Sequence, residues 1–257
     1  MMSKVLIFEV ERMDNLYIVI PAYNEEENIE KVVEEWYQVI KDYKQGQNSR
    51  LVVIDDGSKD NTYTILQRLA ESRPLLVPLH KNNGGHGDTL LFGYQYAIEQ
   101  GADYIFQTDS DGQTNPEEFF KFWEKRMEYN AIFGNRRSRG DGIGRYLIEK
   151  ILCLILWIQF GVTVPDANAP FRLMKASYVK KYMEFMPEHY SLPNVILVAL
   201  GIYFKDNIEF MEITFQPRQG GENSINFCKI MKIGGKALGD FWRIRSKAKR
   251  VKRRQGR

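Results

Sequence analysis

The sequence predicts an α/β fold: a Rossmann-like, mostly parallel sheet flanked by helices, with a helical segment at the C-terminal end. Three observations predict it. Short, continuously apolar runs are typical of strands that are covered on both faces. Longer segments between them place apolar residues on one helical face. The two kinds of segment alternate up to residue 129, as in the strand–helix–strand units of parallel sheets.

The first half of the chain supplies four strand–helix pairs. Strands are predicted where Leu, Ile, Val, Tyr or Phe dominate, at residues 16–20, 51–54, 75–79 and 104–108. Helices are predicted between and after them, at residues 25–44, 61–72, 89–100 and 116–129. The first helix shows a clear apolar face, formed by Ile29, Val32, Val33, Trp36, Val39 and Ile40. Pro116 suits the first turn of the fourth helix.

The second half lacks this regular alternation. Residues 138–144 are rich in Gly, Arg and Ser and predict a mobile loop, and a mostly apolar helix follows at 145–160. The later elements are predicted as a strand at 171–174, a helix at 192–200, an edge or antiparallel strand at 208–216 and a helix at 224–244. We therefore divide the chain into an N-terminal extension (1–15), one main domain (16–225) and an amphipathic helix with a basic tail (226–257).

Composition excludes several classes of protein. The chain has 257 residues, of which 44% are apolar, so it can bury a sizeable core and is not expected to be disordered. Cys153 and Cys228 are too few for a disulfide scaffold, and we expect buried free thiols in a reducing compartment. The longest apolar run, 151–164, is shorter than the roughly 20 residues of a spanning helix. No basic-then-apolar leader opens the sequence, so export is not expected.

Charge is distributed unevenly along the chain. Nine of the 36 basic residues lie in the last stretch, 242–257, which contains no acidic residue. In the rest of the chain the 33 acidic residues outnumber the basic ones. An acidic body with a basic tail indicates an anionic partner for the tail alone.

Four polar clusters follow the four predicted strands. Because parallel strands end at the same edge of a sheet, these clusters are expected to meet at one ligand-binding cleft. They are Pro21-Ala-Tyr-Asn-Glu25, Asp55-Asp-Gly-Ser-Lys-Asp60, Lys81-Asn-Asn-Gly-Gly-His-Gly87 and Asp109-Ser-Asp-Gly-Gln113.

Each of the first three clusters also has a purely structural interpretation. Asn24 and the acids after it could cap a helix, and Asp56-Gly57 could be only a turn. The glycines around His86 could cradle phosphate or simply allow a flexible helix entry. A single histidine such as His86 is more often structural than catalytic.

The fourth cluster points more directly to chemistry. Asp109 and Asp111 are two residues apart, so both face the same side of an extended segment, and Gln113 continues the row. Oxygen ligands of this kind suit Mg²⁺ or Mn²⁺, which bridge the oxygens of a diphosphate. The alternative is that these aspartates cap a helix from within a turn.

Taken together, the clusters carry a family resemblance. The segments IPAYNEEENI, VVIDDGSKDNT, NNGGHGDTL and QTDSDGQTNPEE resemble family-2 glycosyltransferases of the GT-A fold over residues 16–225. Within that family the chain is most similar to polyprenyl-phosphate sugar transferases of the dolichyl-phosphate mannose synthase type. The resemblance implies a transferase that uses a nucleotide-diphosphate sugar, GDP- or UDP-linked, with Mg²⁺ or Mn²⁺ as cofactor.

The resemblance also implies roles for individual residues. A nucleotide pocket would be formed by Pro21, Ala22, Tyr23, Glu25, Ile54 and Asp56. Metal and diphosphate would be bound by Asp109, Ser110 and Asp111, with Gln113 as a further ligand. Donor phosphate, sugar and the reacting centre would be contacted by Arg136, Asp166, Arg172 and Arg218, and catalysis is assigned to Asp111, Asp166, Arg136 and Arg218.

Several positions depart from the family pattern. His86 stands where Lys is frequent, Ala169-Pro170 where Ser/Thr-Gly is common, and Asn194 where relatives often have an acid. The Lys that usually follows Ser224 is also missing. These departures lie on the sugar and acceptor side, so they affect the substrates more than the fold.

The acceptor implied by the resemblance is a polyprenyl phosphate. A hydroxyl acceptor usually needs a carboxylate base, whereas a phosphate is already anionic and needs cations that hold two phosphates close together. Arg136, Arg172 and Arg218 and the metal could supply them in a direct, inverting displacement. Asp166 could instead serve as base for a glycan hydroxyl, so that acceptor stays open. A third alternative is a non-catalytic nucleotide- or nucleic-acid-binding protein, although nucleic acid is not the expected partner.

Two apolar segments bear on membrane contact. Residues 225–244 place apolar residues at helical spacing beside the basic tail, which suits an anionic membrane surface. The alternative is a core-packed last helix with a disordered tail. The run 151–164 is likewise either a core helix or an interfacial helix that faces the acceptor. We expect a cytoplasmic protein that is peripheral on the inner face of the membrane.

Overall fold

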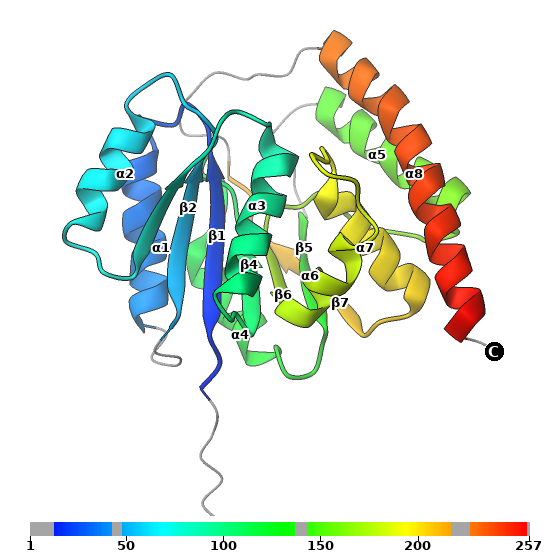
Figure 1. Ribbon diagram of the computed structural model, residues 1–257, viewed down its shortest axis with the longest axis horizontal. Helices are drawn as coiled ribbons and strands as arrows, with labels where there is room; N and C mark the ends of the chain where they lie inside the picture. The colour runs from blue at the N-terminus through cyan, green and yellow to red at the C-terminus, as the bar shows by residue number, and fades with distance from the viewer. Residues whose placement is uncertain (1–12, 43–47, 137–142, 217–226, 256–257) are drawn as a thin grey trace, which may run out of the picture.

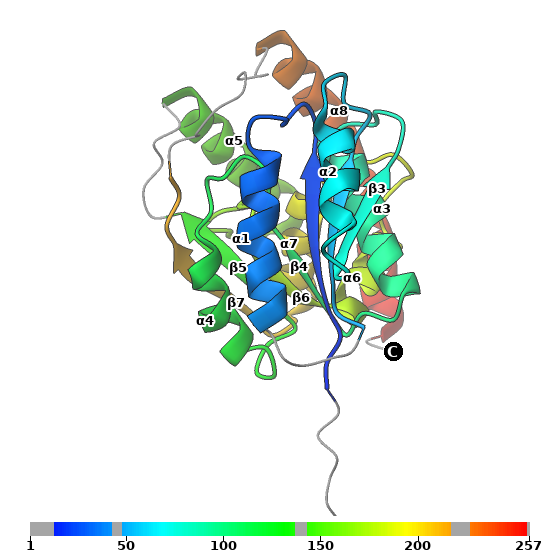
Figure 2. The ribbon, with the colours of Figure 1, turned by 90° about the vertical axis from the view of Figure 1, so that its left-hand side faces the viewer.

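The computed structural model describes residues 13–42, 48–136, 143–216 and 227–255; side chains are described within these ranges except for 143–148, 227–237 and 255. A seven-stranded sheet lies between two layers of helices (Figures 1 and 2). Its strand order is β3-β2-β1-β4-β6-β5-β7. The strands are β1 (Leu16–Ala22), β2 (Arg50–Asp55), β3 (Leu76–His80), β4 (Tyr104–Gln107), β5 (Ala131–Arg136), β6 (Arg172–Lys175) and β7 (Ile208–Ile213).

All neighbouring strands are parallel except for the pairs that involve β6. This strand runs antiparallel to both β4 and β5, between which it lies. The edge strand β7 pairs in parallel with β5. The mostly parallel α/β sheet predicted from the sequence is therefore confirmed.

Helices cover both faces of the sheet. They are α1 (Ile29–Asp42), α2 (Thr62–Ala70), α3 (His86–Glu99), α4 (Phe119–Glu124, after the 3-10 turn Pro116–Glu118), α5 (Ile143–Phe160), α6 (Ala176–Met183), α7 (Pro193–Phe204) and α8 (Phe227–Gln255). One core packs α1, α2 and α4 against one face of the sheet. The other core packs α3, α6 and α7 against the opposite face, together with the inner sides of α5 and α8. These two helices lie side by side at the outside of the second layer (Figure 1).

The alternating apolar faces explain both cores. In β1 the side chains of Ile18 and Ile20 join the α1 core, whereas Tyr17 and Val19 join the α3 core. Every residue of β1 is buried, as expected for a central parallel strand. Trp36 of α1 packs on Phe106 of β4, with ring centroids 5.2 Å apart. The central strands thus run through the core and end at the edge where the polar clusters begin.

Four elements differ from the prediction, two in where they end and two because they were not predicted. The helix predicted over 116–129 ends at Glu124. The strand β5 and the helix α6 were not predicted, because each is short and β5 ends in polar residues. The last helix does not end at residue 244 but continues through the basic tail to Gln255. The predicted mobile loop at 138–144 lies largely outside the described residues.

Within the part of the chain that the structure describes, no helix is both long and apolar enough to cross a membrane. Ala248, inside the basic tail, is fully buried, so the described part of this tail packs on the body of the protein. Lys252 contributes a hydrogen bond from its Nζ to the Tyr203 carbonyl oxygen, 2.7 Å away. The tail of the alternative interpretation, disordered beyond a core-packed helix, is therefore wrong up to residue 255. The three-segment division of the chain stays a prediction.

Candidate active site

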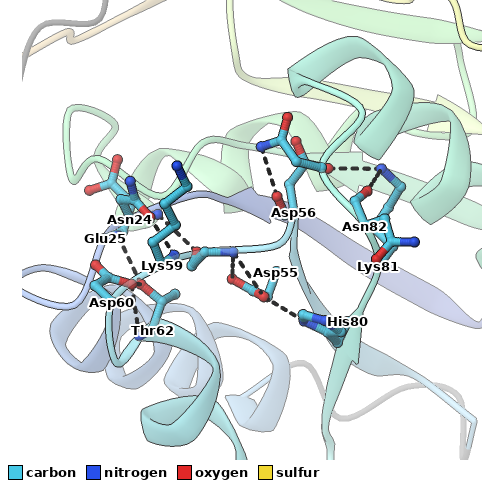
Figure 3. A network of polar contacts seen from close by, with 12 residues as sticks. Asn24, Glu25, Asp55, Asp56, Lys59, Asp60, Thr62, His80, Lys81 and Asn82 are labelled. Carbon is cyan, nitrogen blue, oxygen red and sulfur yellow. Dashed lines mark hydrogen bonds and ion pairs between the residues drawn. The ribbon is translucent and has the colours of Figure 1, made fainter.

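The loops after β1 and β2 are joined by hydrogen bonds between their backbones and side chains (Figure 3). The Asn24 amide nitrogen donates to Ser58 Oγ, and the Lys59 amide donates to Asn24 Oδ1, both at 2.9 Å. Asn24 adopts a left-handed backbone conformation, with φ of 53°, which asparagine tolerates well. Its side chain therefore connects two loops instead of capping α1.

Glu25 lies at the base of a surface hollow between these loops. Its backbone amide donates to Thr62 Oγ1 at 2.9 Å, and its carboxylate accepts a hydrogen bond from Asn28. The hollow is lined by Asn24, Glu25, Glu26, Glu27, Asn28, Lys59 and Asp60. Tyr23 lies beside the hollow and is exposed. Tyr23 and Glu25, both predicted for the nucleotide pocket, therefore lie just after β1, at the carboxyl edge of the sheet.

Three other predicted pocket residues are buried. Pro21 and Ala22 form the end of β1, and both are buried. The Ile54 side chain is fully buried in the core beneath α3. It packs so closely on Gly93 of α3 that a Cβ added there would lie 2.9 Å from the terminal methyl group of Ile54. The Ile54 side chain thus packs inside the protein, and a contact between Ile54 and the nucleotide stays a prediction.

The two aspartates after β2 perform different tasks. Asp55 is fully buried, and its carboxylate lies 2.7 Å from His80 Nδ1. Asp56 holds the loop that follows β3: one carboxylate oxygen accepts from Lys81 Nζ at 2.8 Å and from the Gly84 amide at 2.9 Å. Its other oxygen accepts from the Gly85 amide at 2.8 Å. Asp56 therefore organises the glycine-rich loop, and its contact with a base or ribose stays a prediction.

The glycine-rich loop leads directly into α3. Gly57 has a φ of 68°, and a Cβ there would lie 2.8 Å from the Asn83 amide nitrogen, so only glycine fits at this crossing. Lys81 forms a second ion pair with Asp88 at 2.9 Å, and Asp88 also accepts from His189 at 2.8 Å. Although partial burial alone would raise the pKa of Asp88, its bonds to Lys81 and His189 hold that pKa below its usual value. This loop is thus fixed by charge-assisted bonds.

The fourth cluster lies immediately after β4, the strand beside β1. Asp109 and Asp111 are partly exposed, whereas Ser110 and Gln113 are buried. Asp109 Oδ1 lies 3.8 Å from His86 Nε2 at the start of α3. The Gln113 side chain donates to the Gln216 carbonyl at 2.8 Å, so its amide oxygen is the atom that could bind a cation.

A chain of hydrogen bonds ends on Asp109. Tyr94 of α3 donates to Asn194 Oδ1 at 3.0 Å, and Asn194 Nδ2 donates to Gln107 Oε1 at 3.1 Å. Gln107 Nε2 in turn donates to Asp109 Oδ1 at 3.0 Å. Tyr94, Asn194 and Gln107 are all buried. Three elements of the core, α3, α7 and β4, thereby fix the direction of one carboxylate.

The donor set fits a divalent cation that is shared with a substrate. Among the described residues, no group of three or more His, Cys, Asp or Glu side chains could hold a metal ion by itself. Mg²⁺ is commonly bound by one or two carboxylates together with substrate phosphates, not by a complete protein cage. Asp109, Asp111 and the Gln113 amide oxygen match that pattern, and their assignment as ligands stays a prediction.

Arg136 and Asp166 form a buried ion pair. Arg136 Nε and Nη2 donate to the two carboxylate oxygens of Asp166 at 2.7 and 2.9 Å, a bidentate geometry. Asp166 is only 2% exposed. The Arg136 guanidinium also lies 5.0 Å from the centre of the Phe215 ring. The structure thus brings together two residues predicted at the reacting centre.

Arg172 is enclosed by the backbone. Its side chain is fully buried and donates to three backbone carbonyls, those of Ala169 and Asn194 at 2.7 Å and that of Ala167 at 2.9 Å. A contact between Arg172 and the donor stays a prediction. Arg218 lies outside the described residues.

One residue near the site was not predicted, and another had no role of its own assigned. Glu149 of α5 is buried beside Arg136, with Oε2 3.9 Å from Nη2. The signal for Glu149 was an acid within the mostly apolar stretch 145–160. Lys81 was expected at the cleft only as part of the third polar cluster, and in the structure it links Asp56 to Asp88.

Comparison with known proteins agrees with this geometry. The profile of Glycosyl transferase family 2 matches residues 17–183, more than half of the chain. The chain belongs to glycosyltransferase family 2. It is 25% identical over 228 residues to the undecaprenyl-phosphate 4-deoxy-4-formamido-L-arabinose transferase of Proteus mirabilis, covering 87% of this chain and 66% of that protein. It is 33% identical over 189 residues to the UDP-N-acetylglucosamine–dolichyl-phosphate N-acetylglucosaminyltransferase of Methanococcus voltae, covering 66% of this chain and 72% of that protein.

Solved structures show the same fold at lower sequence identity. Glucosyl-3-phosphoglycerate synthase from Mycobacterium tuberculosis, in complex with Mn²⁺, UDP-glucose and phosphoglyceric acid, superposes with a TM-score of 0.66 at 16% identity. The match covers 91% of this chain and 80% of that one. The GT-A fold and the family resemblance expected from the sequence are confirmed. The chain spans about two thirds of the length of the first curated relatives it matches.

Proposed function

We propose that this family-2 protein is a glycosyltransferase that moves a sugar from a nucleotide-diphosphate donor to a polyprenyl phosphate. Family membership and the two relatives named above, both of which act on polyprenyl phosphates by name, support the proposal. The observation that carries it is the placement of Asp109 and Asp111 directly after β4, which pairs with β1. The loops after β1 and β2 lie along the same edge, where α/β sheets bind their ligands.

The donor side of the reaction uses the carboxyl edge of the sheet. A nucleotide would bind against Tyr23 and Glu25, and Asp109, Asp111 and Gln113 would hold Mg²⁺ or Mn²⁺. The cation, when bound, neutralises the charge of the departing nucleoside diphosphate. The loop held by Asp56 presents the first turn of α3 to the same region, where backbone amides favour anions.

The state of Asp166 favours a phosphate acceptor over a hydroxyl. A general base must accept a proton, but a bidentate bond to Arg136 stabilises the charged carboxylate. A polyprenyl phosphate needs no base, so the Arg136–Asp166 pair would orient the reacting groups during an inverting displacement. In that step the phosphate oxygen bonds to the anomeric carbon while the bond to the nucleoside diphosphate breaks. Transfer to a glycan hydroxyl is the alternative outcome.

The outer surface of α5 and α8 supports a peripheral membrane location. Large apolar side chains are exposed there, namely Ile151, Leu154, Trp157, Ile158, Leu238 and Trp242. We call these six residues the apolar ridge. Exposed cations of α8, including Lys249 and Arg250, continue the same helix. An apolar surface beside such cations suits anionic lipids, so we infer that the protein docks on the cytoplasmic face of a membrane.

The deciding experiment identifies both donor and acceptor. Radiolabelled UDP- and GDP-sugars are incubated with the protein, a polyprenyl phosphate and Mg²⁺ or Mn²⁺, and the product is extracted into organic solvent. We expect lipid-linked product with one donor. Product that stays in water and requires a glycan would favour the hydroxyl acceptor. Nucleic-acid binding with no transfer from any donor would overturn the proposal in favour of the non-catalytic alternative.

Replacing one metal-ligand candidate tests the chemistry. We predict that Asp111→Ala lowers transfer by at least about 100-fold, because the diphosphate loses its cation, while thermal stability changes little at this partly exposed position. Glu117→Ala, at an exposed acid in the following turn, is the matched control and should retain activity. Full activity of Asp111→Ala would refute the metal assignment.

A further inference from the structure

Helix α5 carries an acid on its inner face that neither the family motifs nor the sequence analysis assigned. Glu149 is 6% exposed, whereas Lys150 and the α5 members of the apolar ridge lie on the outer side of the same helix. At 100° per residue, Glu149 shares its side with Leu156 and Phe160, which are buried, and is opposite Leu154 and Ile158. Burying a carboxylate costs free energy unless its oxygens are hydrogen-bonded. The partners of the Glu149 carboxylate therefore indicate its role.

The partners of Glu149 are at the proposed reacting centre. Its Oε1 accepts the backbone N–H of Ala167 at 2.8 Å, directly after Asp166. Its Oε2 lies 3.9 Å from Nη2 of Arg136, whose guanidinium is already bound by Asp166. One side chain thus contacts both the turn that carries Asp166 and the arginine that Asp166 binds.

The turn is held from its other side as well. The Ala167 carbonyl accepts from Arg172 Nη2 at 2.9 Å, and Ala167 is fully buried. Both backbone polar groups of Ala167 are therefore paired, one with Glu149 and one with Arg172. Removing the Glu149 carboxylate would leave the buried Ala167 N–H without its acceptor. An unpaired buried N–H costs free energy, so the turn would have to move to find another partner.

We propose that Glu149 is a positioning residue, which fixes the Asp166–Ala167 turn and the Arg136 guanidinium onto α5. This inference rests on the proposed transferase function. The same helix then has two functions: the outer side of α5 carries residues of the apolar ridge, and its inner side positions the proposed reacting centre. Glu149 itself is not expected to touch donor or acceptor.

Hydrogen exchange tests the contact without any need for activity. In Glu149→Leu the Ala167 amide loses its acceptor, so exchange in a peptide covering residues 164–170 should be at least about tenfold faster, while exchange in β1 stays unchanged. Glu149→Gln retains an amide oxygen as acceptor and should keep most of the protection. Lys150→Gln, at the exposed neighbouring position, is the matched control. Unchanged exchange at 164–170 in Glu149→Leu would overturn the proposal.

Kinetics distinguish positioning from general stability. Glu149→Leu should lower kcat by about 10- to 100-fold, while the KM for the donor stays within about threefold of wild type. Rate losses of this size follow when a reacting group is displaced by about 1 Å or less. Adding Glu149→Leu to Asp166→Asn should cause little further loss, because Glu149 acts through that turn. Independent, multiplicative losses would contradict the proposal. If the wild type transfers no sugar at all, the proposed function fails, while the exchange result still decides the contact.

Discussion

At the scale of single residues, side chains of the same type have different roles because they differ in burial and in their hydrogen-bond partners. Asp55 and Asp56 are adjacent in sequence, yet one pairs with His80 and the other holds the glycine-rich loop. Arg136 and Arg172 were both expected to bind phosphate. Arg136 forms an ion pair with Asp166 at the proposed reacting centre, whereas Arg172 is enclosed by backbone carbonyls.

The thiol of Cys153 provides a test of the inner face of α5 that depends on pH. Burial, reinforced by the negative charge of Glu149, raises the pKa of the Cys153 thiol to about 11. Because the thiolate is the reactive form and one pKa unit is a factor of ten, alkylation near pH 8 should be about 100-fold slower than for an ordinary thiol. The rate should rise with pH until about 11.

This measurement uses a Cys228→Ser variant, so that a single thiol reacts with iodoacetamide. The same variant unfolded in guanidinium is the control and should react rapidly at pH 8. Equal rates in the folded and unfolded states would show that Cys153 is neither buried nor subject to the field of Glu149. Since the folded pKa is raised, the thiol's contribution to stability is present at neutral pH and declines as the pH rises from about 9 to about 11.

At the scale of secondary-structure elements, the carboxyl ends of the strands form the site and the helices behind them orient it. The chain of hydrogen bonds from Tyr94 through Asn194 and Gln107 to Asp109 spans α3, α7 and β4. Outer partners of this kind fix the direction of metal-binding carboxylates. The Asn194 position, where relatives often have an acid, is therefore structural in this chain.

We predict that Asn194→Leu weakens Mn²⁺ binding in the presence of UDP or GDP by about 10- to 100-fold, because Gln107 loses its donor and no longer fixes Asp109. Unfolding stability should also fall by about 1–3 kcal/mol, since buried polar atoms of Tyr94 and Gln107 lose partners. Titration of Mn²⁺ followed by electron paramagnetic resonance measures the first effect, and thermal unfolding the second. Asn207→Ala removes an exposed hydrogen bond to Glu128 and should leave Mn²⁺ affinity intact. Equal Mn²⁺ affinity of the Asn194 variant and wild type would disprove the orienting role.

At the scale of the whole molecule, the proposed function assigns substrate binding and membrane docking to two different surfaces. The polar clusters lie at the carboxyl edge of the sheet. The apolar ridge lies on α5 and α8, which are side by side (Figure 1). The packing of α8 also changes how its basic tail should be tested. Because Ala248 is buried and Lys252 bonds to the body, deleting the tail would remove packing as well as charge.

Point substitutions on the ridge avoid this problem. We predict that Trp157→Ser with Trp242→Ser reduces sedimentation with anionic vesicles by at least about tenfold, since both indoles are more than half exposed and would lose contact with lipid. Charge removal at exposed Lys249, Arg250, Arg253 and Arg254 should weaken binding mainly at low salt. Met127→Ser, at an apolar residue that is 67% exposed beyond α4, is the control. Vesicle binding that survives both sets of changes would exclude the ridge as the docking surface.

Local patterns in the amino-acid sequence were enough to predict the class of fold and the position of most elements. Apolar periodicity is a local property, so β1 to β4 and the helices between them were predicted, as were the four polar clusters that end the strands. The short elements β5 and α6 were missed, because few residues carry their pattern. The antiparallel orientation of β6 also has no local signal, since it depends on pairing with β4 and β5 far away in the chain.

The contacts of each polar residue, in contrast, became visible only in the folded molecule. Asp109 is oriented by Asn194, Gln113 bonds to Gln216, and the Asp166 turn is held by Glu149, all across long separations in sequence. Sequence patterns report which residue types occur at which spacing, whereas the cost of burying a charge or an unpaired amide is settled by neighbours that folding brings together. For that reason the sequence did not predict that Arg172 is enclosed by backbone carbonyls or that Glu149 contacts the Asp166 turn.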